Sequence, residues 1–291
     1  IRAGQANVIV AGGMESMSQA PYVLPKARNG YRFGNGTLLD AMQSDALNDV
    51  YGSYPMGITA ENINDKYQIT RHQQDEFALM SHQHAVKAQK AGYFDSEIVP
   101  VEVKQKRTTV TVTVDEAPRP DTSLAALAKL KPAFKSDGSV TAGNASGIND
   151  GGAALVLASE SAVNRLGLTP LAEWQGSALV GLDPALMGLG PYYAIKKLLK
   201  NQQMSVDDVE IYEINEAFAT QALVCQNLLH LDPSAVNPWG GAIALGHPVG
   251  CSGARIIVTM INEMHRDNHE LGIASLCVGG GMGEAVLLKK I

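Results

Sequence analysis

The regular alternation of short apolar runs and helical segments in the second half of the chain most constrains its fold. Ala153–Ala158, Ile211–Ile214 and Gly272–Val278 have the length and composition of buried strands. Helical segments lie between them, among them Tyr192–Asn201 and Ser252–Arg266. Buried strands that alternate with helices are typical of α/β domains in which sheets and helices form layers. We therefore predict an α/β fold.

The first half of the chain has a different pattern. Val8–Ala11 is a short apolar run ending in two glycines, which predicts a buried strand leading into a turn. Residues 14–60 are rich in loop-forming residues, and Thr70 begins a clear helix. Residues 97–103 and 110–114 alternate like half-exposed strands. The middle of the chain is therefore predicted to be an inserted α+β segment.

Charge and composition exclude several function classes. The net charge is −6, so the chain lacks the overall basic character of a nonspecific nucleic-acid binder. Three cysteines in 291 residues do not make a disulfide framework and fit a reducing compartment. No apolar run is long enough to cross a bilayer, and no signal peptide is visible. We expect a cytoplasmic protein that binds neither membranes nor nucleic acids.

The segment NEAFA, residues 215–219, follows the predicted strand Ile211–Ile214. Asn is a good helix N-cap, and for Asn215 taken alone this structural role has the better odds. The functional alternative is that the Asn215 amide holds a water or a substrate oxygen at a helix N-terminus, where backbone N–H groups favour negative charge.

His247 lies in the glycine-rich segment GGAIALGHPVGCSG, residues 240–253. Glycines allow tight turns and close ligand approach, and Pro248 restricts the backbone of His247. A histidine fixed in this way can exchange a proton or donate an N–H to an oxyanion. The alternative is a structural histidine in a turn. The six other histidines lie on polar or helical stretches and are predicted to be solvated.

Cys277 ends a predicted buried strand and meets the glycine run Gly279–Gly281. A cysteine in an apolar strand is commonly a buried structural thiol. Backbone N–H groups of glycines beside a thiol are, however, what an oxyanion hole needs. Cys225 is predicted to be a core residue, and Cys251 is either a thiol with a lowered pKa near a helix start or a packing residue. No spacing of metal ligands occurs, so we predict no metal site.

Together and in this order, the blocks at 215–219, 240–253 and 277–283 resemble the signature blocks of the thiolase family. The resemblance extends over the chain. Further thiolase-like blocks occur at residues 8–22, 56–63, 141–155 and 187–191.

The resemblance implies a layered αβαβα fold of two similar α/β halves with an inserted loop domain that covers coenzyme A. Residues 1–18 and 143–167 would belong to the N-terminal half, 19–142 to the loop domain and 168–291 to the C-terminal half. Thiolases carry their nucleophilic cysteine in a CxGSG-like block upstream of the first of these segments. No such block exists in this chain. We therefore expect the first half to be incomplete, with on the order of 100 residues missing at the N-terminus.

Catalytic roles follow from the same resemblance. His247 would take the proton of the nucleophilic cysteine and then hydrogen-bond the thioester oxygen, and Asn215 would position a water in the same oxyanion hole. Cys277 would be the acid/base at the α-carbon of the second acyl-CoA, a task that needs a thiol of tuned pKa. The N–H of Gly279 would form part of a second oxyanion hole.

The resemblance also implies a coenzyme A site, with coenzyme A as substrate and product and no permanently bound cofactor. Arg119 would lie near the nucleotide phosphates, and Ser146 would hydrogen-bond the pantetheine. The apolar walls of the pantetheine site would be Met56, Phe134, Ala142, Ala145, Met187 and Phe218. Pro55, Ala126 and Trp239 depart from the pattern of biosynthetic acetoacetyl-CoA thiolases.

The resemblance implies that the intact protein is an acyltransferase that reversibly condenses two acetyl-CoA into acetoacetyl-CoA and CoA. Met187 favours short acyl chains, whereas Pro55 and Trp239 leave a broader range of 3-ketoacyl substrates open. One alternative is therefore a degradative 3-ketoacyl-CoA thiolase of fatty acid metabolism. Another is a catalytically inactive fragment that binds coenzyme A. The family is commonly tetrameric, so we expect a homotetramer or dimer, with residues 19–35 as the candidate contact loop.

Overall fold

The computed structural model describes all residues from 1 to 291 and has a mixed α/β architecture, as predicted. Its centre is a four-stranded sheet with the strand order β7-β10-β9-β8. These strands are β7 Ala172–Gly181, β8 Ile211–Ile214, β9 Leu271–Val278 and β10 Met282–Lys290. β10 is antiparallel to both β7 and β9, and β8 runs parallel to β9.

The two faces of this sheet bury different helices. Tyr212 and Ile214 of β8 pack with Ile195 and Leu198 of α5, which spans Gly190–Gln202. Ile211, the first residue of β8, packs on the opposite face, against α8. Because side chains alternate across a strand, the apolar run of β8 fills two cores at once. Its four residues are all buried, as the sequence predicts.

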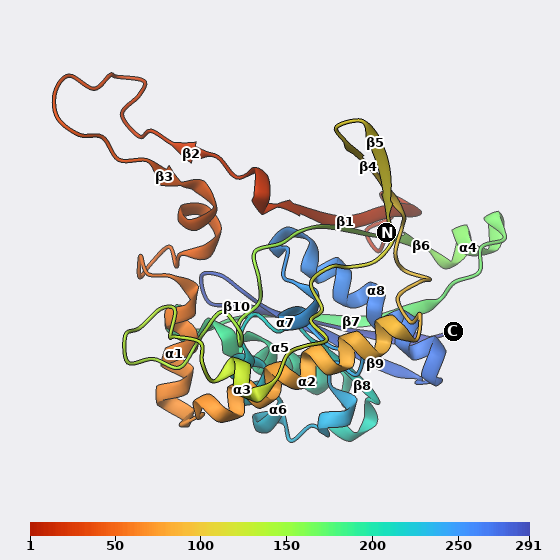
Figure 1. Cartoon of the computed structure of the whole chain (residues 1–291). Helices are drawn as coiled ribbons and strands as arrows, with labels where there is room; N and C mark the ends of the chain where they lie inside the picture. Colours follow the sequence, from red (N-terminus) through yellow and green to blue (C-terminus); the bar gives the residue numbers. More distant parts are fainter.

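Helix α8, Val249–Asp267, lies between the four-stranded sheet and a second, two-stranded sheet (Figure 1). That second sheet pairs β1, Val8–Ser16, antiparallel with β6, Asp150–Ala158. We call it the ribbon. The order of the layers is thus α5, four-stranded sheet, α8 and ribbon, so segments at residues 8–16 and 150–158 are brought over the C-terminal part of the chain.

The exposure of the ribbon shows that two predictions of buried strands are wrong. Val8–Ala11 and Ala153–Ala158 were both predicted to be buried strands, yet Val10 is 71% exposed and Val156 is 68% exposed. These two residues are direct cross-strand partners. The reason is that α8 covers one face of the ribbon only, so alternate side chains face outwards.

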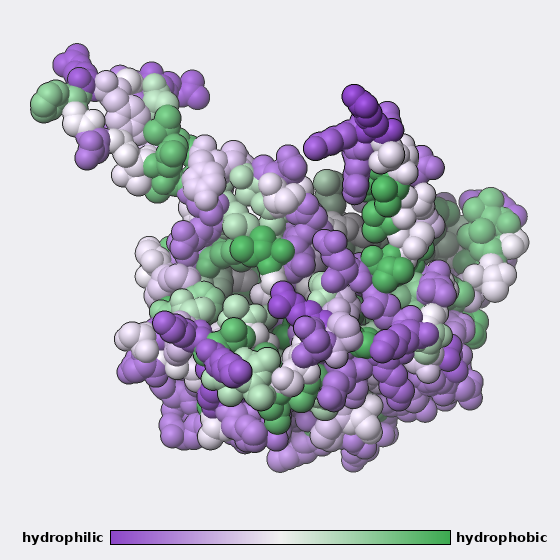
Figure 2. Space-filling model, in the orientation of Figure 1, coloured by the Kyte–Doolittle hydropathy of each residue, from purple (hydrophilic) through white to green (hydrophobic).

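The middle of the chain contains two longer helices, α1, Met56–Tyr67, and α2, Arg71–Lys90. Helix α2 begins as predicted, with Thr70 and Gln73 in a reciprocal capping box. Helix α1 begins inside the region that was predicted to be loop. β4, Val101–Gln105, and β5, Thr108–Val112, form a hairpin that is exposed along its whole length rather than half-exposed. Its tip is hydrophilic and its stem carries apolar residues (Figure 2).

Residues between β1 and α1 extend far from the body of the molecule (Figure 1). They contain the small sheet formed by β2, Tyr22–Val23, and β3, Leu39–Asp40, and the π-helix Gln43–Leu47. Helix α6, Ala219–Leu229, follows β8. The remaining short helices are α3 Leu124–Leu127, α4 Glu160–Leu166, α7 Ala242–Leu245 and the 3-10 turns Met17–Gln19, Pro184–Leu189, Val206–Asp208 and Pro233–Ala235. No helix has the length and apolarity that a membrane span requires.

Candidate active site

His247 is held in a turn between α7 and α8. Gly246, just before it, has a φ of +100°, a conformation that favours glycine. A Cβ at Gly246 would also lie 2.6 Å from the Asn149 side chain. That side chain accepts a hydrogen bond from the backbone N–H of His247 at 3.1 Å. The glycine is therefore required for Asn149, just before β6, to approach and fix the His247 backbone.

The imidazole of His247 is oriented from both sides. Its Nδ1 lies 2.6 Å from Ser252 Oγ, and the Ser252 hydroxyl donates to the carbonyl of Pro248 at 3.0 Å. Because the hydroxyl proton is used in that bond, Nδ1 carries the ring proton and donates it to Ser252. Nε2 is then unprotonated and lies 3.3 Å from the side-chain Nδ2 of Asn215.

Burial of the ring, with a smaller contribution from Arg255, lowers the pKa of His247 to about 4. His247 is therefore neutral at pH 7, with the lone pair of Nε2 available to a proton. This is the form that a general base needs.

Asn215 does not cap a helix, which corrects the structural role that sequence alone favours. Helix α6 begins at Ala219, after the N-cap residue Phe218. Asn215 lies just beyond β8, where its backbone N–H donates to Ser275 O at 2.9 Å. Its side-chain Oδ1 is buried and has no hydrogen-bond partner. Because an unsatisfied buried acceptor is costly, this oxygen is suited to accept a hydrogen bond from a water or a substrate group.

Glu216, the neighbour of Asn215, is a positioning residue that sequence analysis missed. Its buried carboxylate accepts hydrogen bonds from Ser81 Oγ at 2.6 Å, Asn237 Nδ2 at 2.8 Å and the N–H of Ile243 at 3.1 Å. These contacts tie the segment after β8 to α2 and to α7, which leads into the His247 turn. The signal was present in the block at 215–219, where a carboxylate directly precedes three apolar residues.

Cys277 lies at the end of β9 and is buried. It packs in a cluster with five of the residues that were predicted to line the pantetheine site: Met56, Phe134, Ala145, Met187 and Phe218. Burial raises the pKa of the Cys277 thiol to about 12, so the thiol is protonated at pH 7. Gly279 follows in the same turn, and a Cβ there would lie 2.9 Å from Met56.

A cleft of about 490 Å³ is lined by Ala145, which also belongs to this cluster. Arg119 lines this cleft, and so do Asn149 and Gly246, which fix the His247 turn. Ala142 and Ala145, two of the residues that the resemblance assigns to coenzyme A contacts, form part of its wall. The remaining lining residues are His82, Ala117, Asp121, Thr122, Ala126, Leu127, Leu130, Gly143, Gly147, Ile148 and Ile243.

Ser146 lies between Ala145 and Gly147 of the wall in sequence, and Phe218 packs in the same cluster as Ala145. The Ser146 hydroxyl donates to the carbonyl of Ala217 at 3.2 Å, and its backbone N–H donates to the same oxygen at 3.0 Å. The rings of Phe134 and Phe218 meet edge to face, with centroids 6.1 Å apart. The apolar residues predicted for the pantetheine site are thus brought together, although the Ser146 hydroxyl is engaged by the protein itself.

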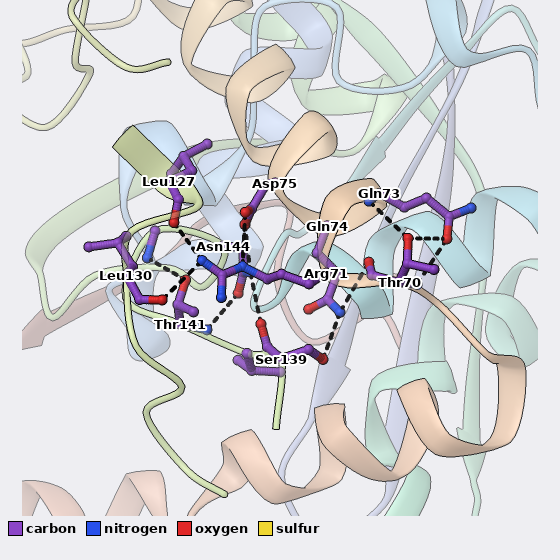
Figure 3. Close-up of polar contacts among 12 residues, drawn as sticks. Thr70, Arg71, Gln73, Gln74, Asp75, Leu127, Leu130, Ser139, Thr141 and Asn144 are labelled. Carbon is purple, nitrogen blue, oxygen red and sulfur yellow. Dashed lines mark hydrogen bonds and ion pairs between the residues drawn. The ribbon is translucent and has the colours of Figure 1, made fainter. Parts of the chain in front are cut away.

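One wall of the cleft is fixed to α2 by a buried polar network (Figure 3). Arg71 pairs with Asp75 at 2.8 Å and also donates to the carbonyls of Leu127 and Leu130, two residues of the cleft wall. Asp75 in turn accepts from Asn144 Nδ2 at 3.0 Å. Asn144 directly precedes Ala145, which lines the cleft. The network therefore fixes the wall to α2 both at Leu127 and Leu130 and at Asn144.

The other cysteines and histidines are not part of this site. For one of these histidines, the prediction that it is solvated is wrong. Cys225 is core, as predicted, and burial also raises the pKa of Cys251, so Cys251 is a packing residue rather than an activated thiol. His82 is buried, not solvated, and its Nδ1 accepts the backbone N–H of Arg119 at 3.2 Å. No group of three or more His, Cys, Asp or Glu side chains is arranged to hold a metal ion.

Comparison with known proteins agrees with this geometry. Residues 1–161 match the family model described as "Thiolase, N-terminal domain", and residues 168–290 match "Thiolase, C-terminal domain". An "Acetyl-CoA acetyltransferase" of Chromobacterium violaceum is 51% identical over 291 residues, which are 100% of this chain and 74% of that protein.

Two solved structures have closely similar folds. The acetyl-CoA acetyltransferase of Bacillus anthracis has a TM-score of 0.97 at 49% identity, covering 100% of this chain and 74% of that one. The human mitochondrial 3-ketoacyl-CoA thiolase has a TM-score of 0.96 at 45% identity, covering 99% of this chain and 73% of that one.

Proposed function

The chain belongs to the thiolase family, and we propose that the protein interconverts two acetyl-CoA with acetoacetyl-CoA and free coenzyme A. The observation that carries this proposal is the pairing of a neutral, oriented His247 with Asn215, whose buried Oδ1 has no partner. Relatives at about half identity that are named acetyl-CoA acetyltransferase support the acetyl substrate.

In the thiolysis direction, His247 Nε2 takes the proton of the nucleophilic thiol, whose sulfur attacks the 3-keto carbon of acetoacetyl-CoA. The bond between C2 and C3 breaks, and its electron pair passes to C2 of the departing thioester enolate. Cys277 gives its proton to C2, which releases acetyl-CoA. The Cys277 thiolate then takes the proton of incoming coenzyme A, whose sulfur attacks the acetyl carbonyl carbon. The bond from that carbon to the enzyme sulfur breaks, and the released thiolate recovers its proton from His247. A thiol with a pKa of about 12 is protonated before the step in which it acts as an acid.

The acylated thiol in this proposal is a cysteine of a CxGSG-like block, which residues 1–291 do not contain. The decisive test combines the intact mass of the natural gene product with an assay of acetoacetyl-CoA thiolysis. A longer and active protein supports the proposal. An active protein of 291 residues would overturn the assignment of the nucleophile, and Cys251 and Cys277 would then be tested by substitution.

We propose that the 490 Å³ cleft receives coenzyme A, with its diphosphate near Arg119 and its pantetheine between Ala142, Ala145 and the cluster around Cys277. Ser146 and Met56 would contact the pantetheine at the catalytic end, beside Gly279 and its N–H. No permanently bound cofactor is needed for this chemistry. Equilibrium binding of coenzyme A to the chain tests the site independently of turnover.

A degradative 3-ketoacyl-CoA thiolase is the second candidate, favoured by the similarity to the human mitochondrial enzyme of that name. Trp239 is buried against Tyr93 and Phe94 and does not line the cleft. Relative thiolysis rates on acetoacetyl-CoA and on a longer 3-ketoacyl-CoA separate the two activities. Binding of coenzyme A without any thiolysis would instead support an inactive coenzyme A-binding species.

We further propose that residues 1–18 and 143–167 form one α/β half, 168–291 the other, and 19–142 the loop domain. The β1–β6 pairing supports the first grouping, because it joins residues 8–16 to 150–158. The protruding segment supports a homotetramer or dimer, since Phe33 at its end is fully exposed at 103%. Light scattering of the protein with and without residues 24–36 tests its role in assembly.

A further inference from the structure

A buried arginine–glutamate pair joins β8 to α8. Nη1 of Arg255, in α8, lies 3.4 Å from Oε2 of Glu213, in β8. The side chain of Glu213 is 1% exposed and that of Arg255 is 19% exposed. Both groups are therefore largely removed from bulk water, where charged side chains are best solvated.

The pair lies on the same face of β8 as Asn215. Ile211 faces α8, and alternate residues of a strand point to the same side, so Glu213 and Asn215 face α8 as well. Asn215 continues the strand, since its backbone N–H donates to β9. Its side chain reaches His247 at 3.3 Å. The contact between Glu213 and Arg255 therefore lies next to this one, two residues back along the same strand face.

Arg255 is also linked to the imidazole of His247 through α8. The ring Nδ1 donates to Ser252 Oγ at 2.6 Å. Ser252 and Arg255 are three residues apart in α8, so they are neighbours on one side of the helix. The guanidinium is near enough to act on the ring. Burial lowers the pKa of His247 to about 4, and the positive charge of Arg255 adds to that lowering.

Glu213 does not cancel the charge of Arg255 below pH 8, because burial raises the pKa of Glu213 to about 8. A protonated carboxyl still accepts a hydrogen bond through its carbonyl oxygen, so Glu213 holds the guanidinium without neutralising it. The thiol of Cys251 also lies near Arg255, and burial raises its pKa. Four further carboxyl groups lie near Arg255, and burial raises the pKa of each of them: Glu97, Asp115, Glu216 and Glu263.

We propose that Arg255 is a positioning residue for His247, in which the fixed positive charge keeps the imidazole free of a proton and Glu213 holds the guanidinium in place. The inference rests on the proposed function, in which Nε2 must be unprotonated to take the proton of the nucleophilic thiol. Stability alone does not account for the pair. One nitrogen of Arg255 and one oxygen of Glu213 are buried without a partner, and apolar residues of similar volume are often at least as stable in such places.

The test follows the titration of His247 in the 291-residue chain by NMR of the histidine ring C–H groups, with His247→Gln to identify its signal. In Arg255→Met, we expect the pKa of His247 to rise by about one pH unit, because a nearby positive charge is removed while the ring stays buried. Arg255→Lys retains the charge and should keep the pKa close to that of the wild type. Arg266→Met is the matched control, since Arg266 is exposed in the last turn of the same helix and stacks on Tyr93.

A double variant guards against a single variant that does not fold. Glu213→Gln/Arg255→Met removes both partners, so no buried charge is left unpaired, and it should raise the pKa of His247 as much as Arg255→Met does. In the natural gene product, the acid limb of kcat/KM for acetoacetyl-CoA thiolysis should move to higher pH by the same amount, because this limb reports the base of the free enzyme.

An unchanged pKa of His247 in Arg255→Met and in the double variant overturns the inference, and so does an equal rise in Arg266→Met. An equal rise in Arg255→Lys also overturns it, because packing rather than charge would then be the cause. An acid limb that stays in place while the pKa rises separates Arg255 from the reaction and overturns its positioning role. A wild-type gene product without thiolysis overturns the proposed function instead, and the NMR titration still decides whether Arg255 controls the proton of His247.

Discussion

The ribbon and the four-stranded sheet are both built from apolar strands, yet they contribute differently to the molecule. The sheet has α5 on one face and α8 on the other, and Asn215 and Cys277 lie at the ends of its strands. The ribbon has α8 on one face only. It supports the His247 turn from the other side, where Glu15 Oε2 accepts the N–H of Gly250 at 3.2 Å. The sheet thus carries the candidate residues Asn215 and Cys277, and the ribbon supports the turn that carries His247.

Glycine is what allows the ribbon to make this approach. A Cβ at Gly13 would lie 1.8 Å from the carbonyl oxygen of Gly250, and a Cβ at Gly151 would lie 2.6 Å from Pro248. Close backbone contact of this kind leaves no space for a side chain. The glycines of the ribbon therefore have a function that its exposed apolar residues do not share.

The largest expected effect lies on the sheet side, at Cys277. In the natural gene product, Cys277→Ala should lower the rate of acetoacetyl-CoA thiolysis by about 10²- to 10⁴-fold, because it removes the proposed acid/base. Cys225→Ala is the matched control. Its thiol is also buried with a pKa of about 12, but it lies inside α6 and contacts the carbonyl of Gly188.

Steady-state kinetics with both variants, checked by circular dichroism, measures this difference. Similar rates for the two variants would assign Cys277 to packing and would remove the chemical contrast between the sheet and the ribbon.

The next largest effect is expected in the ribbon. Gly13→Ala should lower the free energy of unfolding by about 3 kcal/mol or more, because the new methyl group overlaps the Gly250 backbone. Gly152→Ala lies on the partner strand, directly opposite Met14, and its new Cβ would meet only one atom, at 4.0 Å. Its unfolding free energy should stay within about 1 kcal/mol of the wild type. Urea denaturation monitored by fluorescence compares the two, and equal losses would contradict the packing argument.

The two regions explain why sequence predicted some features and not others. The strand Ile211–Ile214 was located to the residue, because its three apolar residues occupy both faces and are buried on both. The run Ala153–Ala158 looks the same in sequence, but its burial depends on how many layers cover it, which no local pattern encodes. His247 and Cys277 are candidates because of their glycine-rich surroundings.

Other parts of the site had no local signal. Asn149 and Ser252 fix the His247 backbone and ring, yet Asn149 is 98 residues away in the chain. His82 appears on a polar stretch of helix and is buried only because the segment around Arg119 folds over it. Contacts of this kind depend on tertiary folding, so the residues that support a site are harder to predict than those that react.

A third difference concerns buried charge. Glu213 of β8 faces α8, where it lies 3.4 Å from Arg255. Burial raises its pKa to about 8, and burial likewise raises the pKa of Glu263. Burial also raises the pKa of Glu97 to about 7 and raises that of Asp115 in the same cluster. In the ribbon the sign is opposite, because hydrogen bonds from Ser18 lower the pKa of the exposed Asp150.

A raised carboxyl pKa means that the folded protein holds protons which the unfolded chain has released. Stability is therefore highest below the ordinary pKa of about 4.5 for these groups and falls as the pH rises through 7 and 8. We expect the free energy of unfolding to drop by about 2 kcal/mol between pH 6 and pH 8, on the basis of up to about 1.4 kcal/mol per pH unit for each proton.

Glu263→Gln should reduce this slope, because both carboxylate oxygens of Glu263 are buried without a partner and its proton would no longer be required. Asp150→Asn, in the ribbon, should leave the slope between pH 6 and 8 unchanged, since the stability from Asp150 is lost only as the pH falls through its lowered pKa. Urea denaturation across this range measures both, and a flat profile in the wild type would contradict the buried-carboxyl account.

The smallest effect concerns the outer face of the ribbon. Val156→Thr should change the free energy of unfolding by no more than about 0.5 kcal/mol, because Val156 is 68% exposed. Val286→Thr places the same hydroxyl in the core between β10 and α8, where Val286 is 6% exposed, and should cost about 1–3 kcal/mol. Urea denaturation of the natural gene product measures the free energy of unfolding of both variants. Equal costs at the two positions would mean that the outer face of the ribbon is covered there, and the contrast between the two sheets would then disappear.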